Sequence, residues 1–268
     1  MPTLAAFFES ARLPVMSEVA RALVRTLNDK DATAGEVQKI IAQDPALTAN
    51  LLRQANSASF GLSRQVESLE RAIAVLGMSQ VRALALATSF RSTFPVVEGF
   101  SRTEFWKSSM ACAAYAQWLA NRAEMDGQQA WLIGMMLRLG ELLIGQRSPE
   151  LLAEIEAPPH RGRVRWEREQ RLLGFDEAQV TAVLARRWNF PQAIVDALQN
   201  ASSPMTAKPF DGLGAAVHLA ALLADNPHAP QAAVDELPQD VIFALALDRQ
   251  WMVDNFPVKE SFLDVSGS

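Results

Sequence analysis

Apolar residues recur every three or four positions along most of this 268-residue chain, and this spacing constrains the fold more than any other feature. Such a period places apolar side chains on one face of an α-helix, whereas a half-buried strand needs strict alternation. No alternating run between turn signals is long enough to predict a strand. The sequence therefore predicts an all-α fold.

Helix-start signals precede many of these periodic runs. Thr33 with Glu36 has the capping-box pattern, and Asp44 precedes Pro45, which suits a first helical turn. Capping side chains accept hydrogen bonds from the free N–H groups of that turn. We expect helices over residues 17–28, 33–41, 45–55, 68–76, 79–90, 101–123, 128–144, 149–156, 164–172, 176–187, 191–199, 212–224 and 239–253.

One stretch interrupts the helical pattern more clearly than the others. Between Phe94 and Ser101, Pro95 and Gly99 separate two runs of helical period. We therefore predict two helical lobes. The first is an N-terminal helix bundle over residues 1–95, and the second is a C-terminal helical lobe over residues 96–268.

Composition restricts the environment of the protein. It is that of an ordinary globular protein, with 49% hydrophobic and 21% charged residues, and a net charge of −5 gives no support to non-specific binding of nucleic acid or anionic membranes. The single cysteine, Cys112, excludes an intramolecular disulfide and indicates a reducing compartment. The first residues do not resemble a signal peptide, and the longest uncharged run, Ser108–Asn121, is too short to span a membrane. We expect a cytoplasmic protein without membrane association.

Seven short motifs follow one another between Leu13 and Phe90. They are Leu13-Pro14, Asp44-Pro45-Ala46-Leu47, Leu51-Leu52, Ala55-Asn56-Ser57-Ala58, Phe60-Gly61, Ala72-Ile73 and Leu76-Gly77. Later motifs are Phe105-Trp106, Leu173-Gly174-Phe175 and Trp188-Asn189-Phe190-Pro191. Together they resemble the HDOD family, the HD-related output domains of bacterial signalling proteins, over about residues 10–205. The resemblance implies a helical fold whose second lobe is HD-like.

The octet Gly134–Glu141, GMMLRLGE, lies within this likeness. It resembles the signature helix of the HD metal-dependent phosphohydrolases, where a small-residue apolar run leads into adjacent His and Asp, an apolar residue, Gly and Lys. Leu137 stands at the His position, Arg138 at the Asp position and Glu141 at the Lys position. An upstream His position holds Ser108. The resemblance therefore implies that the metal ligands are replaced.

Hydrolysis by an HD-type site needs imidazole and carboxylate ligands that converge on one cavity. Two of the three histidines lie in predicted loops and His218 lies on an apolar helix, with no His-x-x-x-His or His-Asp motif. Asp176 and Asn200 stand where relatives often have His. A positive charge at Arg138 would also repel a divalent cation. We predict no metal, no cofactor and no catalytic residue.

Arg138 itself has two interpretations. It can pair with Glu141, three residues along the predicted helix, where an exposed pair contributes about 0.3 kcal/mol. Alternatively, a cation in the vacated site can hold a phosphate or carboxylate, with Ser108 as a second contact. We favour the ion pair.

Two further residues are candidate partner contacts, if the groove between the lobes is a binding surface. They are Asn56, at the start of the predicted loop Asn56–Gly61, and Trp106 of the long helix. The simpler interpretations are that Asn56 satisfies backbone groups and that Trp106 packs in the core.

The segment Arg161–Arg171, RGRVRWEREQR, contains five arginines and a tryptophan. Basic residues interleaved with an aromatic residue can follow a nucleic-acid backbone. Because Glu167 and Glu169 interrupt the segment and the chain is acidic, a solvated helix face accounts for it more simply. We do not expect nucleic-acid binding.

Three functions remain open. The HDOD resemblance implies a non-catalytic signal-transduction module that binds another protein, such as a kinase, a cyclic-dinucleotide enzyme or another regulator. The second is a sensor that binds a nucleotide or other anion in the vacated HD cavity. The third, residual HD-type phosphohydrolase activity, is disfavoured by the missing ligands. The sequence predicts neither the identity of the partner nor the oligomeric state.

Overall fold

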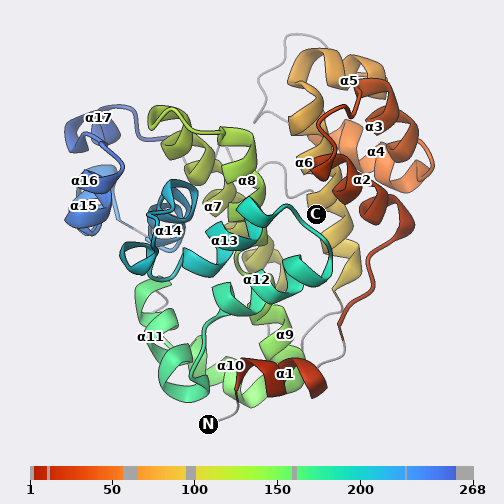
Figure 1. Ribbon diagram of the computed structural model, residues 1–268. Helices are drawn as coiled ribbons and strands as arrows, with labels where there is room; N and C mark the ends of the chain where they lie inside the picture. Colours follow the sequence, from red (N-terminus) through yellow and green to blue (C-terminus); the bar gives the residue numbers. More distant parts are fainter. Residues whose placement is uncertain are drawn as a thin grey trace.

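A computed structural model describes residues 3–10, 13–56, 65–94, 101–158, 162–226 and 228–257. These residues form helices and no strand, so the predicted all-α class is confirmed (Figure 1). The helices before residue 95 are α1 (Leu4–Ser10), α2 (Glu18–Asn28), α3 (Ala34–Ile41), α4 (Pro45–Ala55), α5 (Leu69–Leu76) and α6 (Met78–Thr93).

The later helices contain the HD-like motifs. They are α7 (Arg102–Arg122), α8 (Gly127–Met136), α9 (Leu139–Arg147), α10 (Pro149–Ile155), α11 (Gly162–Leu173), α12 (Glu177–Arg187) and α13 (Gln192–Asn200), followed by a 3-10 turn η2 (Pro204–Thr206), α14 (Gly212–Ala224), α15 (Pro230–Asp235), α16 (Gln239–Ala244) and α17 (Arg249–Asp254). Predicted helix starts are confirmed where a side chain caps the first turn, at Ser17, Thr33, Asp44, Ser68, Ser101 and Asp176.

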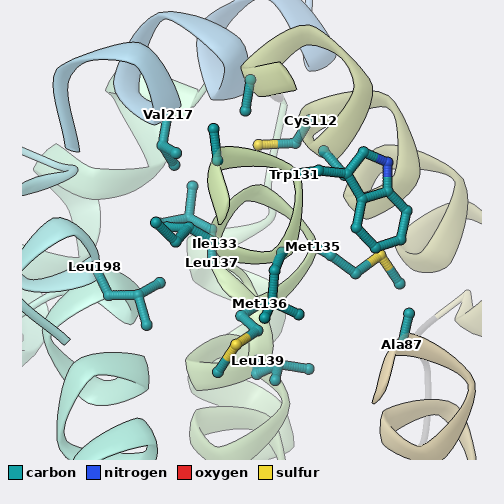
Figure 2. Packing of buried hydrophobic residues seen from close by; sticks show 14 of the residues in the cluster. Ala87, Cys112, Trp131, Ile133, Met135, Met136, Leu137, Leu139, Leu198 and Val217 are labelled. Carbon is teal, nitrogen blue, oxygen red and sulfur yellow. The ribbon is translucent and has the colours of Figure 1, made fainter. Parts of the chain in front are cut away.

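Helix α8 occupies the centre of the packing. It lies against α7 over most of its length and also touches α6, α13 and α14. Figure 2 shows Ile133 and Leu137 on the side of α13 and α14, and Met135 on the side of Ala87 in α6. A helix that is apolar all round must be buried all round, and this explains why α8 is surrounded.

The helices α2–α6 pack on one another and lie together in Figure 1. Contacts between α6 and α8 join them to the later helices, and the buried apolar side chains form one continuous cluster through both parts. The predicted boundary falls partly on residues 95–100, outside the described residues. The division into lobes at residue 95 stays a prediction.

Helix α1 departs from that division, because it packs on the later helices (Figure 1). The ring of Phe7 meets that of Phe175 edge-on, with 5.4 Å between their centroids. Arg147 donates a hydrogen bond to the Phe7 carbonyl oxygen (3.1 Å), and Arg187 lies 4.9 Å from the ring centroid of Phe8. The start of the chain therefore contributes to the second half of the core.

The prediction of one continuous helix over residues 128–144 is wrong, because the helix is broken within the octet. Helix α8 ends at Met136 and α9 begins at Leu139, while Arg138 has φ −85° and ψ 3°. Thr181 of α12 enters the break, where its Oγ1 donates to the Leu137 carbonyl (2.8 Å) and accepts from the Gly140 N–H (2.7 Å). A distant residue thus satisfies the backbone groups that the break releases, and no local pattern could reveal it. The helix predicted over residues 239–253 is likewise divided, into α16 and α17.

Two glycines of the octet allow close helix packing. A Cβ at Gly140 would lie 2.2 Å from the carbonyl oxygen of Glu177 in α12. A Cβ at Gly134 would lie 2.9 Å from the Cα of Ala113 in α7. Both obstacles are backbone atoms, so a larger residue would have to move a whole helix.

Among the described residues, no single helix is both long and apolar enough to cross a membrane. In the same part of the chain, the pair α5 and α6 together meets the length and composition required, and the two helices are bent by 120° from each other.

We expect Gly140→Ala to lower the free energy of unfolding by about 1–3 kcal/mol, because the new methyl group meets the α12 backbone. The matched control is Gly35→Ala in α3, where no atom lies within 4 Å of the added Cβ and alanine favours the helix. Urea denaturation measures both. Equal effects of the two substitutions would contradict the close approach of α9 to α12.

Candidate functional site

Three of the residues at the HD positions, Ser108, Arg138 and Glu141, come together in a buried cluster of polar and charged side chains. Ser108 comes from α7, Arg138 from the break between α8 and α9, and Glu141 from the first turn of α9. The cluster, here called the ion network, contains Ser108, Arg138, Glu141, Glu156, Arg165, Glu177 and Asp225. It therefore joins α7, α9, α10, α11, α12 and α14.

Arg138 is only 7% exposed and is held by protein groups on every side. Its Nε and Nη2 lie 2.8 and 2.7 Å from Oε2 of Glu141, and its Nη1 donates to Oγ of Ser108 (2.9 Å). Asp225 Oδ1 lies 3.7 Å from Nη1, and Glu156 Oε1 lies 3.5 Å from Nη2. The predicted pair with Glu141 is present, but it is buried and belongs to a network, so the value expected for an exposed pair does not apply.

Arg165 of α11 is the second cation of the ion network, with an exposed fraction of 3%. Its Nη1 donates to Oδ2 of Asp225 (2.7 Å) and its Nη2 donates to Oε1 of Glu177 (2.8 Å). The hydroxyl of Ser108 donates to Oδ1 of Asp225 (3.0 Å) while it accepts from Arg138. Asp225 is therefore bound to Arg165 directly and to Arg138 through Ser108.

Burial and charge pairing oppose each other in this network. Burial favours the neutral form of Asp225, but Arg165, Arg138 and the hydrogen bonds from Arg165 and Ser108 outweigh it and lower the pKa of Asp225. Burial and nearby Arg165 likewise disfavour the charge on Arg138, but surrounding carboxylates raise its pKa. Burial, with the carboxylates of Glu156 and Glu177, raises the pKa of Glu141 despite its contact with Arg138. Both arginines stay charged and are compensated within the protein.

Metal coordination does not fit this arrangement. Over the described part of the chain, no group of three or more His, Cys, Asp or Glu side chains is placed to hold a metal ion. The carboxylates of the ion network instead surround two guanidinium groups. A divalent cation here would meet two positive charges at short range.

The other predicted contacts lie outside the ion network. Asn56 links the end of α4 to Val66, because its Nδ2 donates to the Leu52 and Val66 carbonyls (both 2.8 Å) and its Oδ1 accepts from the Val66 N–H (2.7 Å). Residues 57–61 of the predicted contact loop fall outside the described residues. Trp106 is 2% exposed and packs edge-on against Phe105, with 4.9 Å between the ring centroids. Both positions thus have structural roles.

The two residues at further His positions also have structural roles. Asp176 caps α12, where its Oδ1 accepts from the Gln179 N–H (3.0 Å). Asn200 at the end of α13 donates to Oδ2 of Asp211 (3.2 Å).

The prediction of a solvated helix face for Arg161–Arg171 is wrong for one side of α11. Arg165, Trp166 and Glu169 are buried there, whereas Arg163 and Glu167 form an exposed ion pair. The spacing of Arg165, Glu169 and Leu173 places them on one helix face, so helical periodicity could have identified an inward side. No local signal links that side to Glu177 or Asp225, which lie 12 and 60 residues along the chain.

Comparison with known families gives a match to the HDOD domain over residues 13–204. The chain belongs to the HDOD family. This match covers the motifs, the octet and most of the ion network, while Asp225 lies beyond its end.

Two proteins illustrate the range of HDOD relatives. An uncharacterised Treponema pallidum protein is 23% identical over 199 residues, which cover 70% of this chain and 37% of that protein. The Vibrio cholerae cyclic di-GMP phosphodiesterase CdgJ is 30% identical over 130 residues, which cover 47% of this chain and 28% of that protein. This HDOD chain therefore corresponds to about a third of the length of these relatives.

Solved structures share the HDOD fold over nearly the whole chain. A candidate phosphohydrolase from Shewanella amazonensis has a TM-score of 0.78 and 27% identity, and the alignment covers 98% of this chain and 96% of that one. A candidate signal-transduction protein from Marinobacter aquaeolei also reaches 0.78, at 21% identity, with 98% and 66% covered. An HDOD domain protein of unknown function from Geobacter sulfurreducens has a TM-score of 0.71, 20% identity and 98% and 87% coverage.

We expect Arg138→Leu to destabilise the protein by about 3–5 kcal/mol, because it leaves Glu141 and Asp225 buried without one of their cations. The double variant Arg138→Leu/Glu141→Leu should recover a large part of that loss. The control is Arg163→Ala, which removes the exposed partner of Glu167 and should lower the free energy of unfolding by at most about 0.5 kcal/mol. Denaturant unfolding of these variants and of the single variant Glu141→Leu measures the coupling, and additive losses at 138 and 141 would contradict a cooperative network.

Glu169 provides a test by pH. It is buried, and burial followed by the charge of Glu177 raises its pKa well above the ordinary value. Between the unfolded pKa of about 4.3 and the raised folded value, the folded state holds more protons, so stability falls as pH rises through this window. Glu169→Gln should remove this pH dependence. Its free energy of unfolding should therefore increase relative to that of the wild type as the pH rises.

Denaturation midpoints between pH 5 and 9 measure the effect of Glu169→Gln. The control is Glu167→Gln, whose carboxylate is exposed on the same helix. Parallel pH profiles for Glu169→Gln and the wild type would show that Glu169 is ionised without penalty.

Proposed function

We propose that this chain is a non-catalytic HDOD signal-transduction module that acts by binding another protein. The observation that carries the proposal is the ion network, in which Arg138 and Ser108 stand in place of metal ligands and are bound to each other and to carboxylates of the protein. A phosphohydrolase of this class needs a metal-bound water as nucleophile and a metal to hold the phosphate. The ion network supplies neither.

The ion network also weighs against an anion sensor at Arg138. Its guanidinium nitrogens contact Glu141, Ser108, Asp225 and Glu156, and the side chain is almost completely buried. A phosphate or carboxylate ligand would first have to displace a buried carboxylate and would leave that charge without its partner. The arrangement is therefore self-sufficient and supports a structural role for the former ligand positions.

The relatives support a signalling context. One is named a cyclic di-GMP phosphodiesterase and another is described as a candidate signal-transduction protein. The match to the phosphodiesterase covers 28% of that protein, so the activity in its name is a property of the much longer chain. A kinase, a cyclic-dinucleotide enzyme or another regulator is the class of partner that we propose.

The first part of the proposal, that the module is non-catalytic, predicts that the purified chain turns over no phosphoester substrate. The purified chain should retain no stoichiometric metal and should not hydrolyse bis(p-nitrophenyl) phosphate or cyclic di-GMP with Mn²⁺ or Mg²⁺ present. Elemental analysis and product chromatography measure this. Hydrolysis that disappears in Asp225→Asn would contradict a non-catalytic module, because that carboxylate lies at the centre of the ion network.

The binding part is tested by affinity capture from the native cell extract, followed by reassembly from purified components. A signalling protein should be captured and should re-form the complex with the purified chain. The control is Arg138→Leu/Glu141→Leu, which changes only buried side chains and should keep the partner. Failure of the purified components to form the complex would overturn the proposed protein interaction. A small ligand that binds the wild type but not Arg138→Leu/Glu141→Leu would point to a sensor instead.

A further inference from the structure

A pocket of about 990 Å³ lies between α11, η2, α14 and α16. Apolar side chains form much of its wall, including those of Trp166, Leu222 and Val241. Its size is in the range of pockets that hold small organic ligands. Asp176, one of the HD positions, lies in its wall, but neither the ion network nor the proposed protein-binding role accounts for the pocket.

The pocket lies directly behind the ion network. Three elements each supply one residue to the network and an adjacent residue to the pocket wall, in the pairs Arg165 and Trp166, Glu177 and Asp176, and Asp225 and Asn226. The indole N–H of Trp166 donates to Oε1 of Glu177 (3.0 Å), so this ring is fixed by the network. The wall nearest the network is therefore rigid.

His218 of α14 lines this pocket and contains a second ring nitrogen that can accept a hydrogen bond. It is 8% exposed, and its Nδ1 lies 2.7 Å from the carbonyl oxygen of Ala201. A carbonyl can only accept, so Nδ1 carries the proton, and burial lowers the pKa of His218 so that the ring is neutral. The Nε2 lone pair remains, and within the described residues no donor binds it.

Trp166 provides an aromatic surface next to that acceptor. Its ring stacks on the imidazole of His218, with 5.1 Å between the centroids and an angle of 27° between the planes. The indole N–H is taken by Glu177, so Trp166, which is 4% exposed and lines the pocket, has no donor left for a ligand and offers it only ring atoms. Aromatic faces attract organic cations.

The charged residues around the pocket are mainly acidic. Four carboxylates and one arginine line it: Glu167, Asp176, Glu236, Asp240 and Arg163. Arg163 pairs with Glu167 at 3.2 Å. Glu236 accepts a hydrogen bond from Nδ2 of Asn226 (3.1 Å) and lies 3.5 Å from Nε2 of His228, and Asp240 adds a second carboxylate on the α16 side. A phosphate would be repelled here, whereas a cation would be attracted.

We propose that this pocket binds an organic cation, an ammonium or guanidinium group carried on an aromatic or apolar body. The ligand donates a hydrogen bond to Nε2 of His218, its body packs on Trp166, and its charge faces Glu236 and Asp240. A free amine and a basic side chain of a polypeptide share this chemistry. The inference is independent of the proposed protein partner, and its failure would leave that proposal unchanged.

Binding of benzamidine to the full chain tests the proposal, with benzoate as the planar anionic control. Titration calorimetry or two-dimensional NMR should show saturable binding of benzamidine at up to millimolar concentration and none of benzoate. The double variant Glu236→Gln/Asp240→Asn should weaken benzamidine binding about fivefold or more, since it removes two attracting charges. The control Glu67→Gln/Glu70→Gln, at exposed positions outside the pocket, should bind as the wild type does.

His218→Asn tests the acceptor separately. The Asn amide can keep the hydrogen bond to the Ala201 carbonyl but lacks an acceptor at the position of Nε2. It should weaken benzamidine binding about tenfold while the circular dichroism spectrum stays that of the wild type. If His218→Asn does not fold, the double variant Glu236→Gln/Asp240→Asn decides the outcome.

The source of the cation is distinguished by a second probe. The blocked peptide acetyl-Leu-Arg-Leu-amide is titrated beside benzamidine, in the wild type and in Glu236→Gln/Asp240→Asn. Tighter binding of the peptide would identify a basic side chain of a polypeptide as the ligand. Tighter binding of benzamidine would identify a free small-molecule cation. Absence of binding by both probes, or equal binding of benzoate and benzamidine, would overturn the proposal.

Discussion

A guanidinium group buried between helices must find its counter-charges inside the protein, and Arg138 imposes this requirement on the structure. Its partners come from α7, α9, α10 and α14, and Arg165 extends the same network to α11 and α12. Removing either arginine leaves buried carboxylates without compensation. The ion network therefore fixes the relative positions of six helices that are distant in sequence.

The octet shows how a motif can keep its packing role without its ligands. Gly134 and Gly140 allow α8 and α9 to approach the backbones of α7 and α12, and Leu137 fills the core beside α13 and α14 (Figure 2). These constraints are steric and do not depend on a metal. The likeness to the HD signature helix thus reflects helix packing, while Arg138 and Glu141 supply the charges that balance one another.

The neighbouring pocket differs from the ion network in what it leaves unsatisfied. Within the network the arginines are surrounded by carboxylates, so an incoming anion gains little. In the pocket, His218 keeps a free acceptor and the acidic side chains outnumber the single arginine. Because Trp166 lines the pocket and donates to Glu177 of the network, a ligand in the pocket would contact a side chain that the network holds. The pocket and the ion network are therefore adjacent but chemically distinct.

The sequence by itself determined the helical class, most helix starts and the HDOD family, because periodicity and capping are local and the family motifs keep their order along the chain. It also predicted the Arg138–Glu141 pair, whose members are three residues apart. Only the tertiary structure decided the helix break at Leu137 and Arg138, the burial of that pair and the inclusion of Arg165, Glu177 and Asp225. These features depend on Thr181 and on carboxylates from other helices, and contacts between side chains so far apart in sequence leave no periodic signal.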